Sequence, residues 1–201
     1  MTTQTVTSAV LVAAGASERF SSGNKLLHKL NGKELILHSA DALLASEVEQ
    51  LVIVTQPHDE KMIELLQQRF SQCAVTLLAN PAHKSGMASS IRVGIHHCQQ
   101  SANTIVALAD MPHVQPPTLN ALIRSAQTSE HLIFCPHSVK GRGNPILFKA
   151  ALYPALMALE GDFGGKPLLK QFSDQIELVA VNDAGIYKDY DTLKDFEHQK
   201  S

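Results

Sequence analysis

The strongest constraint on the fold of this chain is the alternation of short, continuously apolar runs with segments of helical periodicity. Runs rich in Val, Ile, Leu and Ala are typical of strands that are buried on both faces of a sheet. Strands are predicted at Ala9–Ala13, Gln50–Thr55, Val75–Ala79, Thr104–Ala109 and His131–Cys135, and after these at Pro145–Phe148 and Ile176–Val181. Helices are predicted at Leu35–Ala45, Asp59–Phe70, Met87–Cys98, Thr118–Ala126, Leu152–Leu159 and Pro167–Phe172. This alternation predicts an α/β fold whose mostly parallel central sheet is covered on both faces.

The length and charge of the chain limit its organisation and its partners. With 201 residues and no repeat, low-complexity tract or linker, the sequence is expected to form one domain over residues 1–201. A formal net charge of −2 gives no polycationic surface for neutralising phosphates, so no nucleic-acid partner is expected. Small anionic substrates stay compatible with this charge, because a few local basic residues are enough to bind them.

Cysteine usage and hydropathy indicate a cytoplasmic protein. Cys73, Cys98 and Cys135 are odd in number and far apart, so reduced thiols are expected rather than disulfides or a zinc site. The apolar run over residues 9–14 is too short to span a bilayer and lacks the basic flank of a signal peptide. Neither a membrane span nor a leader is therefore expected.

A loop of small residues follows the first predicted strand. Ala13, Ala14 and Gly15 carry almost no side chain, so their backbone amides can approach a bulky anion closely. Arg19 and Lys25 add positive charge, and this combination suits a triphosphate. The loop is no Walker A motif, because no Ser or Thr follows the lysine, and no dinucleotide fingerprint, because the G-x-G-x-x-G spacing is absent. A tight turn without a ligand is the alternative interpretation.

Two carboxylates follow other predicted elements. Asp110 comes directly after the strand at Thr104–Ala109, where the carboxyl ends of parallel strands bind ligands and where Mg²⁺ would need an oxygen ligand. A turn or helix cap before Pro112 is an equally good interpretation. Asp191, in the C-terminal segment, is either a second metal ligand or the N-cap of a final short helix.

Asn80 and the segment 84–90 lie where a loop enters the helix predicted at Met87–Cys98. The free amides of a helix N-terminus, with the hydroxyls of Ser89 and Ser90, suit a phosphate, a base or a ribose. The two serines serve equally well as caps for the amides of the helix itself.

Two glycine-rich segments follow the regular α/β part of the sequence. One contains Arg142 and Asn144, and the other contains Asp162 and Lys166. These segments are expected either to form the pocket of a second substrate or to be surface loops.

Taken together, the segments LVAAGASERF…NKLL, N…SGMASSI, ALADMP, GRGNPILF, GDFGGKPLL and DYDT resemble the MobA-like nucleotidyltransferases, and within them the molybdenum cofactor cytidylyltransferase branch. The resemblance runs in order from about Val10 to Asp195. It implies a three-layer, Rossmann-like α/β fold of the GT-A type. It also implies transfer of a nucleotidyl group from a triphosphate to a phosphorylated acceptor, with release of pyrophosphate.

The resemblance implies roles for individual residues. Lys25, Arg19 and Asp110 would be catalytic, and Asp110 with Asp191 would bind Mg²⁺. The nucleotide would be bound by Ala13, Ala14, Gly15, Arg19, Lys25, Asn80, Gly86, Ser89 and Ser90. The acceptor would meet Arg142, Asn144, Asp162 and Lys166. In this last loop Gly164, Gly165 and Lys166 stand where relatives often have G-A-R.

The identity of the substrates also follows from the resemblance. Relatives that use GTP tend to carry glycines at the positions of Ala13 and Ala14, so the expected substrates are CTP and molybdopterin or molybdenum cofactor, and a molybdoenzyme is the expected recipient of the product. The same chemistry with another nucleotide or phosphorylated acceptor is an alternative. A second alternative is a protein that delivers the cofactor without catalysis. Such a protein would not need residues that bind a triphosphate and a metal ion. Oxidoreductase chemistry, assigned to some members of the wider family, is disfavoured because the dinucleotide fingerprint is absent.

Overall fold

A computed structural model of the chain describes residues 6–15, 20 and 23–197. The strands are β1 (Thr7–Ala13), β2 (Lys29–Leu30), β3 (Lys33–Glu34), β4 (Gln50–Thr55), β5 (Val75–Ala79), β6 (Asn103–Leu108), β7 (Ile133–Ser138), β8 (Gly141–Arg142), β9 (Ile146–Lys149) and β10 (Ile176–Ala180). The α-helices are α1 (Leu35–Leu44), α2 (Glu60–Phe70), α3 (Met87–His97), α4 (Pro116–Thr128), α5 (Tyr153–Met157), α6 (Lys166–Gln171) and α7 (Leu193–Glu197). No helix in these ranges is both long and apolar enough to cross a membrane.

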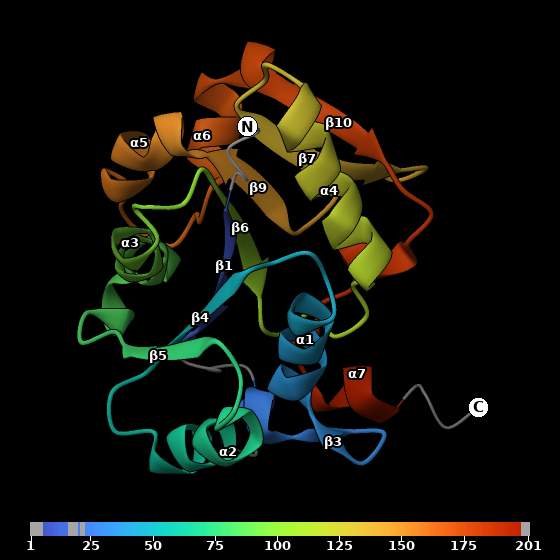
Figure 1. Ribbon diagram of the computed structural model, residues 1–201. Coiled ribbons are helices and arrows are strands. Elements are labelled where there is room, and N and C mark those ends of the chain that lie inside the picture. The colour runs from blue at the N-terminus through green and yellow to red at the C-terminus, as the bar shows by residue number, and fades with distance from the viewer. Residues whose placement is uncertain (1–5, 16–19, 21–22, 198–201) are drawn as a thin grey trace.

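Eight of these strands form a mostly parallel central sheet, as the sequence predicts, and β2 and β3 form a separate two-stranded sheet (Figure 1). Its order is β10-β7-β9-β6-β1-β4-β5, and β8 pairs with β7. β1 is parallel to both β4 and β6, and β4 is parallel to β5. β9 runs antiparallel to both of its neighbours, β6 and β7. The Rossmann-like α/β class is therefore confirmed, with β9 and the short β8 running opposite to the other strands of the sheet.

The predicted strands and helices are all present, with ends that differ by a few residues. The largest difference is at the strand predicted for His131–Cys135, which is shifted toward the C-terminus as β7. Asp59 caps α2 by accepting a hydrogen bond from the Met62 backbone N–H. The short β2–β3 hairpin and β8 were not predicted, because neither is long enough to carry a periodic apolar pattern, whereas α7 is the final short helix of one interpretation of Asp191. All three cysteines are free thiols, as expected.

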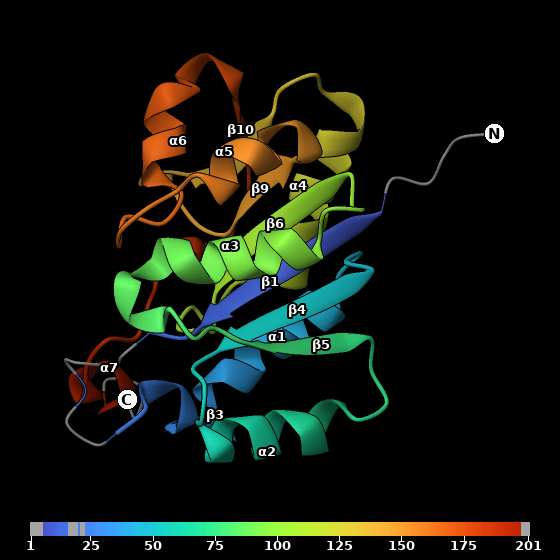
Figure 2. The same ribbon diagram turned by 90° about the vertical axis from the view of Figure 1, so that its left-hand side faces the viewer.

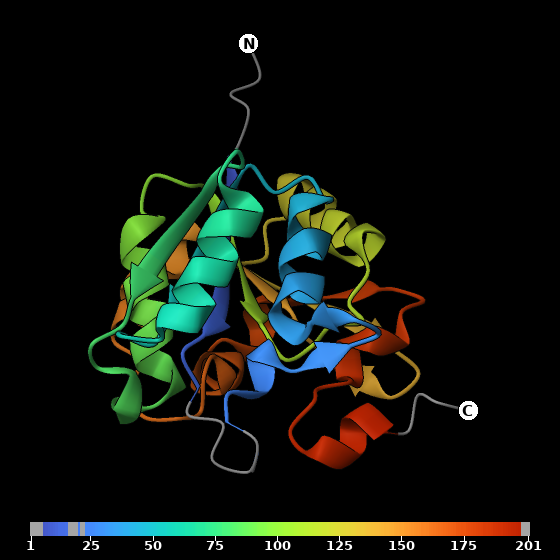
Figure 3. The same ribbon diagram turned by 90° about the horizontal axis from the view of Figure 1, so that it is seen from below.

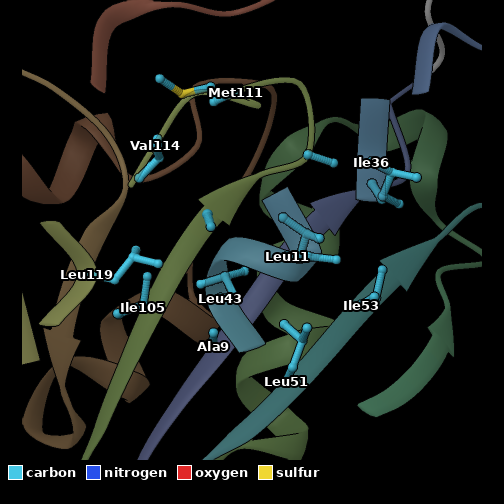
Figure 4. Close-up of a cluster of buried hydrophobic side chains, with 14 of the residues drawn as sticks. Ala9, Leu11, Ile36, Leu43, Leu51, Ile53, Ile105, Met111, Val114 and Leu119 are labelled. Carbon is cyan, nitrogen blue, oxygen red and sulfur yellow. The ribbon is translucent and has the colours of Figure 1, made fainter. Parts of the chain in front are cut away.

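Alternate residues of the inner strands pack on opposite faces of the sheet. Ala9, Leu11 and Ala13 of β1 join the core under α1, α2 and α4, and Figure 4 shows Ala9 and Leu11 beside Leu43 of α1. Val10 of β1 and its neighbours on the other face join the core under α3, α5 and α6, which lie in front of the sheet in Figure 2. The inner strands are buried on both faces, which explains their continuous apolar character.

Gly94 sets the distance between α3 and β1. A Cβ atom at this position would lie 2.3 Å from Cγ1 of Val10. The glycine therefore lets the helix pack directly against the central strand. This packing also fixes where the N-terminus of α3 lies at the edge of the sheet.

Gly94→Ala is expected to lower the free energy of unfolding by about 1–3 kcal/mol, because the added methyl group overpacks the contact with Val10. At an exposed position in the middle of a helix, replacing Gly by Ala would raise the free energy of unfolding by about 1 kcal/mol. Chemical denaturation measures the effect, and His96→Ala, at an exposed site of the same helix, is the control. A Gly94→Ala protein as stable as the wild type would contradict the close packing.

Candidate functional site

The carboxyl ends of β1, β4 and β6 open into a cleft of about 840 Å³. Ligands of open α/β sheets bind at this edge, where the loops after the strands meet. The cleft is lined by Val12, Ala13, Ala14, Gly15, Lys25, Leu26, Gln56, His83, Lys84, Ser85, Gly86, Met87, Ser90, Leu108, Asp110, Gly161, Asp162 and Asp191. The first, central and last parts of the chain therefore all contribute to one site.

A lysine joined to two carboxylates lies on the wall of this cleft. Nζ of Lys25 donates to Oδ2 of Asp110 and to Oδ1 of Asp191, at 2.7 Å in each case. The three side chains are largely buried, with exposed fractions of 13% for Lys25, 21% for Asp110 and 27% for Asp191. The structure thus brings together three residues that the sequence analysis selected separately.

Backbone contacts place the two carboxylates side by side. Asp110 follows β6, and its carbonyl oxygen accepts a hydrogen bond of 3.0 Å from the N–H of Tyr190. Tyr190 is fully buried, and its hydroxyl lies 2.7 Å from Nε2 of His113. Beyond it, the Asp195 carboxylate accepts from the backbone N–H groups of Asp191 and Thr192, as in a capping box at the start of α7. Asp191 is therefore fixed by contacts before and after it in the chain.

The short 3₁₀ turn η1 (Lys25–Leu27) fixes the backbone of Lys25. Oδ1 of Asn24 caps this turn by accepting from the Leu26 N–H, and Nδ2 of Asn24 donates to Asp59 at 2.7 Å. The ring of His28, which follows this turn, packs against Phe196 of α7, so η1 and α7 lie at the same end of the molecule (Figure 3).

Lys25 and Asp110 shift each other's pKa. Burial alone would lower the pKa of Lys25, but its hydrogen bonds and charge interactions with Asp110 and Asp191 raise that pKa above its ordinary value. Burial raises the pKa of Asp110, Lys25 opposes this, and the nearby charges of Asp189 and Asp191 raise it further. The charges of Asp189 and Asp191 near Asp110 favour the binding of a cation by the Asp110 carboxylate.

Asp110 also has a free oxygen that suits a cation. Its Oδ1 is buried and has no hydrogen-bond partner among the described residues. Within that part of the chain no group of three or more His, Cys, Asp and Glu side chains is placed to hold a metal. Asp110 and Asp191 fit a divalent cation that takes its remaining ligands from a substrate, which is how Mg²⁺ is commonly bound beside phosphates.

The floor of the cleft is made by the small residues after β1. The side chains of Ala13 and Ala14 are buried, and nothing lies within 4 Å of where a Cβ of Gly15 would be. Nε2 of Gln56 donates to the carbonyl oxygen of Gly15 at 2.8 Å and so fixes this turn from the neighbouring strand. Arg19, the other cation selected from this loop, lies outside the described residues.

The serines of α3 take part in a buried network. Nδ2 of Asn80, which is fully buried, donates to Oγ of Ser89 at 2.8 Å and of Ser90 at 3.0 Å. Of these three residues, Ser90 alone is among those that line the cleft. The alternative that the serines cap α3 is wrong, because Gly86 is the N-cap and Ser89 Oγ donates to its carbonyl oxygen at 2.8 Å. Asn80 and Ser89 therefore support the wall from behind.

The N-terminus of α3 is bonded to another part of the protein. The N–H of Met87 donates to Oδ1 of Asp162 at 3.0 Å, and the N–H of Ala88 donates to the carbonyl oxygen of Gly161 at 3.1 Å. The segment 161–162 thus closes one side of the cleft.

The four residues expected to meet the acceptor do not lie together on the cleft wall. Asp162 lines the cleft, whereas Arg142, Asn144 and Lys166 are not among its lining residues. Arg142 lies in the short strand β8, and Lys166 is exposed at the start of α6. The Asn144 N–H donates to the carbonyl oxygen of Ile186 at 2.9 Å.

The sequence analysis missed several residues that shape the site. Asn24, Gln56 and Tyr190 position the loops around Lys25 and Asp110, and His83 lines the cleft. The Asn before Lys25 is a recognisable cap signal. The contacts of Gln56 and Tyr190 join segments that are distant in the sequence, and no local sequence pattern predicts such contacts.

Gly86→Ala is expected to cost more stability than Gly141→Ala, although both glycines have positive φ (98° and 102°). A Cβ at Gly86 would lie 2.5 Å from the backbone of Gly161, whereas nothing lies within 4 Å at Gly141. Backbone strain alone predicts a loss of about 1–3 kcal/mol for Gly141→Ala. Unfolding experiments on the two variants compare the losses, and equal values would show that the contact between residues 86 and 161 is not tight.

Comparisons with known proteins place these features in a family. The family model described as the MobA-like NTP transferase domain matches residues 9–176. The nicotine blue oxidoreductase of Paenarthrobacter nicotinovorans is 27% identical over 192 residues, which cover 92% of each chain. A probable molybdenum cofactor guanylyltransferase of Thermococcus sibiricus is 33% identical over 138 residues, which cover 68% of this chain and 65% of that one.

A similar fold is also found among solved structures. Rv0371c of Mycobacterium tuberculosis superposes with a TM-score of 0.81 at 22% identity, covering 96% of this chain and 97% of that one. A second structure of that protein, in complex with manganese, has a TM-score of 0.77 at 20% identity and covers the same shares. At these identities the likeness establishes the fold.

Proposed function

This chain belongs to the MobA-like NTP transferase family, and from that premise we propose that it transfers CMP from CTP to the terminal phosphate of molybdopterin or molybdenum cofactor. Pyrophosphate is the second product. Nucleotidyl transfer is the activity of the family, and the finer assignment of base and acceptor is our proposal. The observation that carries it is the group of Lys25, Asp110 and Asp191 on the wall of a cleft large enough for a nucleotide.

The cleft residues divide into those for the phosphates and those for the metal. Ala13, Ala14 and Gly15 let backbone amides approach the phosphate chain closely, and Lys25 adds positive charge. Arg19 is proposed to act with Lys25. Asp110 and Asp191 are proposed to hold Mg²⁺, which when bound would neutralise phosphate charge and orient the α-phosphate.

The proposed reaction is an in-line displacement. An oxygen of the acceptor phosphate attacks the α-phosphorus of CTP, a new P–O bond forms, and the bond from the α-phosphorus to the pyrophosphate oxygen breaks. The acceptor phosphate is already an anion near neutral pH, so no general base is required. The protein's contribution is to align two anions and to stabilise the charge that develops on pyrophosphate. Lys25 and Arg19 are proposed to provide this stabilisation.

The preference for CTP is proposed from the residues after β1. Ala13 and Ala14 place two buried methyl groups at the cleft, where GTP-using relatives tend to carry glycine. These methyl groups leave less room than glycine would, which favours the smaller pyrimidine base. Several matched relatives are named guanylyltransferases, so the choice of base is a direct test of this argument.

The acceptor is proposed to enter on the side of the cleft formed by Gly161 and Asp162. Arg142, Asn144 and Lys166 are proposed to contact it beyond the cleft wall. A molybdoenzyme is proposed to receive the product. Delivery of an unmodified cofactor would need neither triphosphate nor metal ligands, and the group around Lys25 therefore supports catalysis.

An oxidoreductase is the second candidate, because a protein of that name matches over 92% of the chain. The sequence lacks the G-x-G-x-x-G fingerprint of dinucleotide-binding loops, which favours the transferase. Oxidation of NADH or NADPH by the purified protein, followed at 340 nm with quinone-type acceptors, would favour the oxidoreductase.

The test of the proposed function is release of pyrophosphate by the purified protein with Mg²⁺ and molybdenum cofactor. CTP, GTP and ATP are supplied separately, and release is expected with CTP and only when the cofactor is present. Release with GTP in place of CTP would overturn the argument from Ala13 and Ala14 but keep the transferase. No release with any of the three would contradict the proposed function.

Lys25→Ala and Asp110→Ala are each expected to lower the turnover number by roughly 100-fold or more, the scale observed when an electrostatic stabiliser is lost. Single-turnover measurements at saturating CTP separate this effect from binding. Lys33→Ala is the matched control, because Lys33 pairs with Asp41 away from the cleft. Unchanged turnover in Lys25→Ala would remove that lysine from the mechanism.

A further inference from the structure

The ammonium of Lys25 occupies the position between two carboxylates that a bridging cation would take. Its Nζ lies 2.7 Å from Oδ2 of Asp110 and 2.7 Å from Oδ1 of Asp191. These carboxylates come from segments far apart in the chain, and both face the cleft. A metal ion bound by the two oxygens that Lys25 now contacts would therefore require Lys25 to move.

We propose that Lys25 and a divalent cation compete for the carboxylates of Asp110 and Asp191, so that the metal binds tightly only together with a nucleoside triphosphate. This inference rests on the proposed function, since it assumes that the cleft binds both ligands. It assigns Lys25 a role before the reaction begins, in addition to its role toward the phosphates.

The local structure allows the side chain to move while its backbone stays fixed. The cap by Asn24 and the bond from Asn24 to Asp59 hold the turn that carries Lys25. The lysine side chain is a flexible stem with a compact charge, and Ala14 and Gly15 line the same cleft without filling it. Lys25 can therefore turn from the carboxylates toward bound phosphates by rotation of its own side chain.

The charges explain why metal and nucleotide would bind cooperatively. Lys25 offsets the repulsion that Asp110 experiences from the charges of Asp189 and Asp191, and a metal ion bound there would offset the same repulsion. A metal ion that binds alone must displace the ammonium from its ion pairs with both carboxylates, which is unfavourable. A triphosphate gives the ammonium another anionic partner, so each ligand raises the affinity for the other.

The test measures binding of Mn²⁺ to the full chain by electron paramagnetic resonance, with and without CTP and without acceptor. In wild-type protein CTP is expected to increase the affinity for Mn²⁺. Lys25→Met, which keeps the length of the stem, should bind Mn²⁺ alone roughly 10-fold more tightly than the wild type, because the competing charge is gone. The same variant should lose most of the increase that CTP causes.

Two further variants keep the test decisive. Lys25→Arg retains the positive charge and should bind Mn²⁺ alone as weakly as the wild type. Lys33→Met removes a lysine that is paired with Asp41 at 2.7 Å away from the cleft, and it should not change Mn²⁺ binding. Circular dichroism and thermal unfolding establish that each variant is folded.

Equal or weaker Mn²⁺ binding by folded Lys25→Met would overturn the competition. Failure of CTP to bind to any variant would instead contradict the proposed function. The comparison of Lys25→Met, Lys25→Arg and wild type without nucleotide would still decide the competition in that case. The two failures are therefore distinguishable.

Discussion

The ion-paired group of Lys25, Asp110 and Asp191 is the contact on which the arrangement of the cleft depends. Its members are separated by 85 and 166 positions along the chain, so it joins the N-terminal loop, the central strand and the C-terminal segment. The backbone bond from Tyr190 to Asp110 and the cap by Asp195 support it from both sides. A site assembled from such distant segments can form only when the sheet between them is correctly folded.

The sheet and two glycines of the α3 region, Gly86 and Gly94, shape the cleft around this group. β1, β4 and β6 end at the same edge, so the loops after them share one cleft. Gly94 brings α3 close to β1, and Gly86 lets residues 161–162 cover the start of that helix. The result is a groove whose floor consists of small residues, with cationic and carboxylate side chains on its walls. This combination suits a phosphorylated ligand that carries a metal ion.

The sequence was sufficient to predict the class of fold and several residues that line the candidate cleft, because both depend on local patterns. Continuous apolar runs marked the inner strands, and the residues after them, such as Gly15 and Asp110, were selected because they follow strand ends. The reversed direction of β9 was not predictable, since periodicity carries no information on direction. The burial of Asn80 and the positions of Arg142 and Lys166 outside the cleft wall depend on contacts between distant segments, which a single sequence does not reveal.

The most direct measurement is a crystal structure of the protein soaked with CTP and Mn²⁺, with the metal located by its anomalous scattering. A manganese peak is expected at Asp110 and Asp191, with the triphosphate over Ala14 and Gly15 and with Nζ of Lys25 turned from the carboxylates to the phosphates. A nucleotide bound outside this cleft, or manganese away from both carboxylates, would contradict the account.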